Sequence, residues 1–494
     1  MNKLALALLI VGLLLAVLTN TGLLSFRQKY IYQLSENLSL GAPVTAFVDV
    51  TVIPMDNERT LEHQTVVVRD GIIERIGDSA QVEVPAEALV IDGRGRYLMP
   101  GLVDMHVHVE YPNDLLLFVA NGVTTVRNMW GNTDRKLWFG LPDQLTMKKQ
   151  IAEGKLFAPT IYTAGPVMEG KPANHPLMET FTSPEQAAES VAWQKAQGYD
   201  FVKVYDHLSP EIYEAILHSA IEQGLPTVGH VPFAVGLDGV LSSGQITIEH
   251  LTGYVDPDAV RFLIPEDELD EYAARTKDAG VWNCVTLTEY PKSKQTAEVF
   301  DQLQHQPGMV YQSPSTRLFS PFMYYMASQS HSYQGEDYPQ RVADLNRRMV
   351  QALHNAGAGI LLGTDSAQAY HLPGFSFHEE LALLVEAGLT PYEALKAGTR
   401  DASLALGREY EFGLVAEGQR ADLLLLEANP LEDVSNANQR TGVMLRGRWY
   451  GSDELQSMLA ALADSYQPSL PERLWPLILI VSALPRIWKQ KFMP

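Results

Sequence analysis

The sequence is poor in cysteine and in basic residues. Its one cysteine, Cys284, cannot form a disulfide within the chain, and a single thiol excludes a cysteine-rich metal site. The 37 Lys and Arg residues are outnumbered by 59 Asp and Glu residues, which gives a formal net charge of −22, and no dense basic run occurs. We therefore expect no nucleic-acid partner. Any bound metal ion must be held by histidine and carboxylate side chains.

Length and hydrophobic content are sufficient for a large core. The chain has 494 residues, of which 46% are hydrophobic, and no internal repeat or low-complexity tract stands out. These values exclude a disordered chain and a short secreted scaffold. A homo-oligomer remains open, because the sequence does not determine the number of subunits.

Apolar segments mark both termini. In residues 1–26 an apolar run extends from Leu4 to Leu18, and the residues after it do not resemble a small-residue cleavage site. An uncleaved N-terminal transmembrane anchor is therefore favoured over secretion after signal cleavage. Residues 470–494 hold a shorter apolar stretch and a basic cluster, which predicts a segment that lies on a membrane or spans it. The basic residues at both ends favour a folded body outside the cytoplasm, periplasmic or extracellular.

Strand-like runs occupy residues 43–99 and return in residues 412–455. In the first block Asp70-Gly71 separates two such runs, and this dipeptide is a strong hairpin signal. We expect the two blocks to form one small β-sandwich domain, with the region between them inserted.

Residues 100–411 alternate short apolar strands with helices, the α/β pattern of a (β/α)8 TIM barrel. Helix starts are indicated by the capping boxes at Ser183 and Thr390, and helix ends by Gly198, Gly224 and Gly357. The excess length of residues 254–348 predicts inserted helices over the barrel mouth. The candidate strands are Gly101 to Val107, Val123 to Val126, Thr160 to Thr163, Phe201 to Val204, Thr227 to Gly229, Ile246 to Ile248, Val281 to Val285 and Ile360 to Leu362.

Residues suited to metal binding stand at the ends of five of these strands. His106 and His108 lie two residues apart on the first strand, so both imidazoles face the same side. Because strand ends of a TIM barrel converge on one site, we expect the set to meet there. The other members are Lys203, His230, His250 and Asp365.

Lys203 requires a separate explanation, because an ammonium group would repel a divalent cation. In an apolar strand among cations its pKa should fall, and the neutral amine can react with carbon dioxide to form an anionic carbamate. A lysine that extends to the barrel rim is the alternative.

These motifs identify the chain as a member of the amidohydrolase superfamily, in its imidazolonepropionase-like and prolidase-like branch. The resemblance covers roughly residues 43–452, from Asp70-Gly71-Ile72-Ile73 and Leu98 to Asp104 through Gly418 to Leu423. It implies that His106, His108 and Asp365 bind one divalent metal ion, usually zinc. It also implies that His230 and His250 bind a second ion, and that carbamylated Lys203 bridges the two.

The implied reaction is hydrolysis of an amide or peptide-like carbon–nitrogen bond in a small molecule. Two cations about 3.5 to 4 Å apart lower the pKa of a bridging water, which attacks as hydroxide, and they polarise the scissile carbonyl. Asp365 would take the proton of the water and pass it to the departing amine. A prolidase or dipeptidase activity is included in this expectation.

The substrate-binding residues are less well indicated. Arg127 and Asn128, at the end of the second strand, are candidates for gripping a carboxylate or carbonyl group. Tyr205 and Tyr254 are candidates for holding an oxyanion, since Val231, not a tyrosine, follows His230. His371 lies in a predicted loop at the barrel mouth, where substrate contacts are common.

Two other functions remain open. The same pair of ions could act on a lactone, a phosphotriester or a deamination substrate, since a fold does not determine a reaction. A barrel that has lost catalysis and only binds a ligand is the other alternative, although the ligand set is intact.

Overall fold

The computed structural model describes the body of the chain. The described residues are 29–37, 41–109, 111–131, 143–174, 178–257, 260–289, 297–313, 316–317, 320–321, 337–368 and 370–466. Among them, no helix is both long enough and apolar enough to cross a bilayer. The anchor predicted in residues 1–26 and the membrane segment predicted in residues 470–494 lie outside the described residues.

Eight parallel strands form the predicted barrel. They are β6 (Leu102–Val107), β7 (Val123–Asn128), β8 (Thr160–Thr163), β11 (Val202–Val204), β12 (Thr227–Gly229), β13 (Thr247–Glu249), β16 (Trp282–Cys284) and β17 (Ile360–Leu361). Neighbours pair in this order, and a bridge from Ala164 to Phe201 joins β8 to β11. A second bridge, from Val107 to Ser366, joins β6 to the segment after β17 and completes the ring. Each predicted strand is present within two residues.

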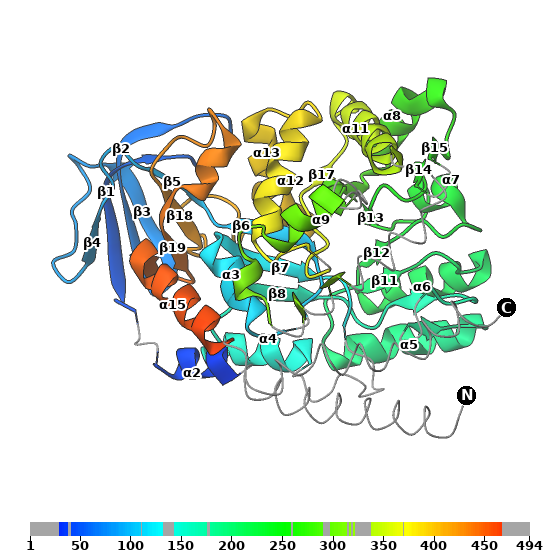
Figure 1. Cartoon of the computed structure of the whole chain (residues 1–494), viewed down its shortest axis with the longest axis horizontal. Helices are drawn as coiled ribbons and strands as arrows, with labels where there is room; N and C mark the ends of the chain where they lie inside the picture. The colour runs from blue at the N-terminus through cyan, green and yellow to red at the C-terminus, as the bar shows by residue number, and fades with distance from the viewer. Residues whose placement is uncertain are drawn as a thin grey trace.

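Helices surround the barrel (Figure 1). They are α3 (Asp114–Ala120), α4 (Gln144–Ala152), α5 (Pro184–Gln197), α6 (Pro210–Gln223), α7 (Gly236–Leu241), α8 (Leu269–Ala279), α11 (Tyr338–Ala356), α12 (Phe375–Glu386), α13 (Pro391–Ala397) and α14 (Arg400–Ala405). Thr390 forms the full predicted capping box with Glu393. Gly198, Gly224 and Gly357 end their helices in the left-handed conformation that glycine adopts readily.

Short elements extend the barrel mouth. Between β16 and α11 lie η2 (Leu287–Glu289), α9 (Ala297–Gln304) and η4 (Met309–Tyr311), within the region where inserted helices are predicted. After β13 the chain forms the hairpin of β14 (Val255–Asp256) and β15 (Arg261–Phe262) and the turn η1 (Glu266–Glu268). β9 (Met168–Glu169) and β10 (Glu179–Thr180) add to the edge of β11.

Both ends of the described chain contribute to a second, β-rich domain, on the left of Figure 1. Its strands are β1 (Val44–Val52), β2 (Leu61–Arg69), β3 (Ile72–Asp78), β4 (Leu89–Asp92), β5 (Tyr97–Pro100), β18 (Leu423–Leu426), β19 (Arg440–Leu445) and β20 (Arg448–Gly451). Asp70 and Gly71 form the β2–β3 turn with φ of 49° and 82°, as the hairpin signal requires.

These strands enclose a shared apolar core that is filled by side chains from both sequence blocks. All eight belong to one hydrogen-bonded sheet, in which β5 pairs with β18 and so joins the two sequence blocks. The first half of β1 pairs with β4 and its second half with β5. The pairing of β1 with β2 shifts register between Phe47 and Val50 and between Val50 and Val52. Such bulges bend a strand, so β1 can serve two partners along one edge within a single sheet.

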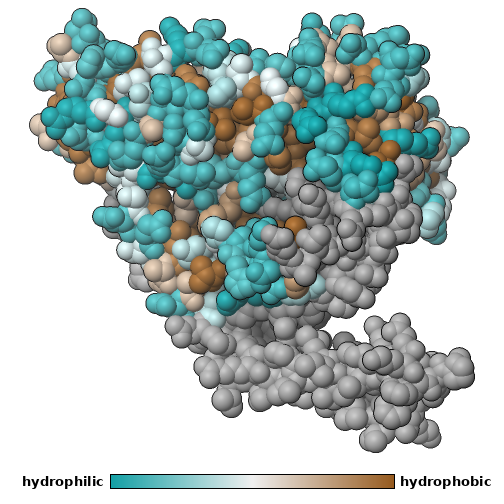
Figure 2. Space-filling model, turned by 45° about the horizontal axis from the view of Figure 1, so that its top comes forward, coloured by the Kyte–Doolittle hydropathy of each residue, from teal (hydrophilic) through white to brown (hydrophobic). Residues whose placement is uncertain are grey.

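Helices α2 (Lys29–Asn37) and α15 (Ser452–Ser465) lie next to each other beside α3 and α4 (Figure 1). The 3-10 turn η6 (Val434–Asn438) precedes β19. The described surface visible in Figure 2 is mainly hydrophilic, in keeping with the large excess of acidic residues. Cys284 is buried in the apolar interior of the barrel, and burial raises the pKa of its thiol. It is therefore a core residue and not a reactive nucleophile.

Candidate metal centre

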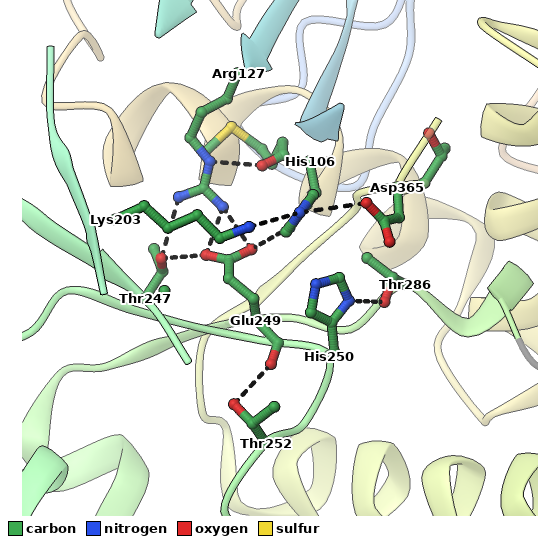
Figure 3. Close-up of polar contacts among 12 residues, drawn as sticks. His106, Arg127, Lys203, Thr247, Glu249, His250, Thr252, Thr286 and Asp365 are labelled. Carbon is green, nitrogen blue, oxygen red and sulfur yellow. Dashed lines mark hydrogen bonds and ion pairs between the residues drawn. The ribbon is translucent and has the colours of Figure 1, made fainter. Parts of the chain in front are cut away.

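The structure brings the six predicted metal-binding side chains together at the carboxyl ends of the barrel strands. Figure 3 shows four of them facing one centre. The six are His106 on β6, His108 just after it, Lys203 on β11, His230 directly after β12, His250 directly after β13, and Asp365 after β17. This is the edge at which TIM barrels place their functional groups.

Asp365 is in contact with both β6 histidines. Its Oδ1 lies 2.8 Å from His108 Nε2 and 3.4 Å from His106 Nε2. Burial alone would raise the pKa of Asp365, but the hydrogen bond from His108 and the surrounding cationic groups lower it below its usual value. The carboxylate is therefore the expected form of this group at neutral pH.

The remaining two histidines complete the cluster. The ring of His250 lies 4.4 Å from the ring of His106 and 5.2 Å from that of His230, measured between centroids. His250 and Asp365 have φ of 59° and 55°, in the left-handed region that non-glycine residues rarely adopt. Strained backbone of this kind is often found at functional sites, where the surrounding fold holds it in place.

Hydrogen bonds orient three of the imidazoles. His106 Nδ1 contacts Glu249 Oε2, His230 Nδ1 contacts Asp206 Oδ1, and His250 Nδ1 contacts Thr286 Oγ1, each at 2.7 Å. An imidazole that donates through Nδ1 presents its Nε2 lone pair, and this is how second-layer carboxylates prepare histidine for a metal ion.

The donor atoms at the centre fit a divalent metal ion. His230 Nε2 is buried without a hydrogen-bond partner among the described residues. One ligand atom from each of His106, His108 and Asp365 lies within 4.8 Å of the others, and the same holds for His250, Glu289 and Asp365. Two neighbouring groups of imidazole and carboxylate donors are the chemistry that zinc and similar ions select.

Lys203 lies in the middle of this cluster. Its Nζ is 3.5 Å from His106 Nε2, and its side chain is buried. No carboxylate of the described residues forms an ion pair with it. Burial lowers the pKa of Lys203, opposed by Asp365 and Glu249 and assisted by Arg127, which favours the neutral amine.

Arg127, a candidate for substrate binding, is buried and bonded to neighbouring strands. Its guanidinium is 1% exposed and donates to Glu249 at 2.8 and 2.9 Å, to Thr247 at 3.1 Å and to the carbonyl of Met105 at 2.5 Å. Figure 3 shows the Glu249 carboxylate between the Arg127 guanidinium and His250. Arg127 is therefore a structural partner of Glu249 beneath the centre.

Asn128 and Tyr254, two other candidates for substrate binding, are bonded within the protein. The Asn128 side chain is buried and bonds to Val109, Trp130 and Thr163, so it joins β6, β7 and β8. The Tyr254 hydroxyl is paired with Thr276 of α8 at 2.6 Å within the core. Their polar atoms are therefore occupied by the protein itself.

Tyr205 and His371 lie at the mouth side of the strands. The Tyr205 ring is 3.9 Å from that of His230, and Lys203 Nζ is 5.6 Å from its centroid. Burial raises the pKa of Tyr205, so its phenol stays protonated and able to donate. His371 is buried in the segment between β17 and α12.

Three carboxylates at the site were not singled out from the sequence. They are Asp206 and Glu249, described above, and Glu289, whose Oε2 is 3.7 Å from His250 Nδ1. Burial and the charge of Asp365 raise the pKa of Glu289 to about 8. Glu249 directly precedes His250, and Asp206 follows Lys203 by three residues, so closeness to predicted ligands is the signal that could have indicated them.

Comparisons with known proteins agree with this architecture. Ochratoxinase of Aspergillus niger is 26% identical over 455 residues, covering 80% of this chain and 83% of the relative. The structure of bottromycin amidohydrolase matches with a TM-score of 0.70 at 23% identity, covering 90% of this chain and 94% of the other. A Xaa-Pro dipeptidase structure matches with a TM-score of 0.62 at 19% identity, over 83% and 100%. At these identities the structural matches show a shared fold.

A family match identifies the chain more directly. Residues 97–450 match the amidohydrolase family, and this range includes all six residues of the centre. The family is one of metal-dependent enzymes, which agrees with the donor set described above. Because the match spans more than half of the sequence, the protein belongs to the amidohydrolase family, which confirms the predicted superfamily and enzyme class.

Proposed function

We propose that this protein hydrolyses an amide or peptide-like bond of a small molecule with the help of two divalent metal ions, zinc in the simplest case. The observation that carries the proposal is the convergence of four imidazoles and Asp365 on one buried centre, with the Nδ1 atoms of three histidines already occupied. His106, His108 and Asp365 would hold one ion, and His230 and His250 the other.

Lys203 would join the two halves of the centre as a carbamate. A buried ammonium without a carboxylate partner is unfavourable, and Lys203 has none among the described residues. Its neutral amine would react with carbon dioxide, forming an N–C bond and releasing one proton, and the product carries a negative charge. That charge would lie beside His106, where Nζ now is.

Bound metal ions would lower the pKa of a water between them and polarise the scissile carbonyl. Asp365 would accept the proton of the attacking water and return it to the amine as the carbon–nitrogen bond breaks, so that amide and water give acid and amine. The protonated phenol of Tyr205 would donate a hydrogen bond to the carbonyl oxygen. Glu249 and Asp206 would keep His106 and His230 in orientation throughout.

The names of the relatives support an amide over an ester or phosphate substrate. They include an ochratoxinase, an amidohydrolase of bottromycin and a Xaa-Pro dipeptidase. A substrate panel of N-acyl amino acids, dipeptides, lactones and phosphotriesters would test this preference directly. Turnover of the amides above the other classes is the expected result, and turnover of only lactones or phosphotriesters would contradict it.

Metal content is the first measurement to make. The full chain, purified in detergent without chelators and with bicarbonate, should contain close to two divalent ions per chain. Protein reloaded with metal should unfold at a higher denaturant concentration than metal-stripped protein, since a ligand that binds only the native state stabilises that state. One ion per chain would contradict the bridging role of Lys203, and none after reloading with zinc would contradict the metal centre as a whole.

We further propose that the terminal segments hold the protein at a membrane, with the folded body outside the cytoplasm. The support for this is the apolar composition of residues 4–18 and 474–485 and the basic residues beyond each run. Flotation of the full chain with lipid vesicles tests it.

A further inference from the structure

The two ends of the described chain meet at one place on the surface. The Tyr30 hydroxyl of α2 donates to the carbonyl of Met458 on α15 at 2.8 Å. Asn113 links the same two helices: its Oδ1 accepts from the Ile31 backbone at 3.2 Å, and its Nδ2 donates to the Tyr466 hydroxyl at 2.9 Å. The start of α2 and the end of α15, which are the first and last described parts of the chain, therefore lie close together.

This place is at the catalytic end of the barrel. Asn113 stands at the start of α3, five residues after His108, so it lies on the connection that leaves β6 at the metal centre. At the opposite end of the barrel, Ser35 of α2 accepts from the backbone of Phe157, which precedes β8. The same Phe157 contacts the ring of Tyr450, just before α15 begins, at 5.0 Å. Both helices thus run along the barrel wall, with Lys29 and Tyr466 at the mouth end.

Apolar side chains are exposed on two loops at the same end. Phe233, in the loop after β12, is 69% exposed, and Val310, on η4, is 52% exposed. The turn η4 contacts α15, and its Met309 packs with Tyr370 and Leu372 of the loop after β17. Val310 therefore lies on a turn that contacts α15, and Phe233 is exposed on another loop of the same mouth.

We propose that the mouth of the barrel faces a lipid surface, so that the substrate is an amphipathic amide dissolved in that surface, such as an N-acyl compound. The inference rests on the proposed amide hydrolysis and adds the substrate class and the orientation of the site. Ten residues separate residues 4–18 from α2, and seven separate residues 474–485 from Tyr466, so a bilayer that holds both apolar runs lies within reach of these short connections from the place marked by Asn113. Because the net charge is −22, anionic lipid would not attract the folded body. Burial of apolar side chains in the lipid surface does not depend on charge.

Orientation can be measured with single labels, because Cys284 is buried and its thiol has a raised pKa. V310C and F233C place a polarity-sensitive fluorophore at the mouth. I221C is the matched control, since Ile221 is 72% exposed at the far end of α6. With the full chain on phosphatidylcholine vesicles that carry a headgroup quencher, the mouth labels should be quenched and the Ile221 label should not. Equal quenching at all three, or quenching of Ile221 alone, would overturn the orientation.

Three further outcomes are distinguishable. A full chain that does not float with vesicles, yet hydrolyses soluble amides, would overturn the inference and leave the proposed function intact. An increase in the molecular mass of the protein particle in the absence of lipid, together with shielding of the mouth labels from solvent, would show that a second copy of the chain covers the mouth. Absence of amide turnover from every soluble and vesicle-bound substrate would contradict the proposed function itself.

The substrate class has its own test. Long-chain and two-carbon N-acyl versions of one amine would be compared, with the long-chain amide embedded in phosphatidylcholine vesicles. Membrane attachment raises the local concentration of an embedded substrate, so kcat/KM for the long-chain amide should exceed that for the short one by at least about tenfold. A preference for the short, soluble amide would overturn the assignment.

Discussion

Glu249 offers the sharpest test of how the centre is built. Its side chain is fully buried and receives hydrogen bonds from Arg127, Thr247 and His106. The substitution Glu249→Gln keeps the shape but removes the charge, and its amide nitrogen must then face a donor of either Arg127 or His106. Removing one member of a buried ion pair typically costs about 3–5 kcal/mol, because the other charge is left uncompensated.

The same substitution should weaken metal binding. His106 would lose the acceptor that determines which of its nitrogens carries the proton, and loss of such second-layer contacts lowers metal affinity by about 10- to 100-fold. The assay is titration of metal-stripped protein with zinc, together with urea unfolding of the stripped form. Glu74→Gln is the matched control, because Glu74 also pairs with an arginine, Arg69, but on the exposed surface. A zinc affinity for Glu249→Gln within about threefold of wild type would refute the positioning role, since the expected loss is about tenfold or more.

The other predictions concern Lys203, Tyr205 and His378. Lys203→Ala should lower kcat/KM for an amide by at least about 100-fold, with partial recovery on adding a small carboxylic acid, and full activity without it would refute the carbamate. Tyr205→Phe should lower kcat by about 100-fold with metal content unchanged, as expected for an oxyanion donor, and a loss of metal instead would indicate a structural role. Burial and the charge of Arg440 lower the pKa of His378 to about 3. Because the unfolded chain takes up this proton first, stability should fall as pH drops from about 6.5 toward 3, by at most about 1.4 kcal/mol per pH unit. In His378→Gln the midpoint of urea unfolding should depend less on pH over this range. A pH dependence equal to that of the wild type would contradict the prediction.

Much of the fold could be predicted because its signals are local. The turn at Asp70-Gly71 requires two positive φ angles, and the dipeptide that tolerates them is visible in the sequence. The capping box at Thr390 and the left-handed ends at Gly198 and Gly224 depend only on neighbouring residues. The single sheet of the β-domain could not be predicted in this way. It depends on β1 pairing with β4 and β5 at once, which is a long-range arrangement.

Two of the candidate substrate-binding residues show a second limit. Arg127 and Asn128 stand at the end of β7, where a polar side chain suggests an open site. In the structure each meets a buried partner from another strand, Glu249 for Arg127 and Thr163 for Asn128. A sequence shows that a polar residue is at a strand end, but not whether another strand satisfies it there.

The hidden role of Glu249 has the same origin in backbone geometry. Successive residues of a strand point to opposite faces, so Glu249 and His250 should not both serve one centre. The structure resolves this conflict at His250, whose φ of 59° takes the chain out of the strand conformation directly after β13. His250 therefore reaches the centre directly, while Glu249 reaches it through His106. Asp365 has a similar φ of 55° at the end of its own segment. Two of the proposed ligands thus depend on a left-handed residue at the strand edge, a feature that alternation patterns cannot reveal.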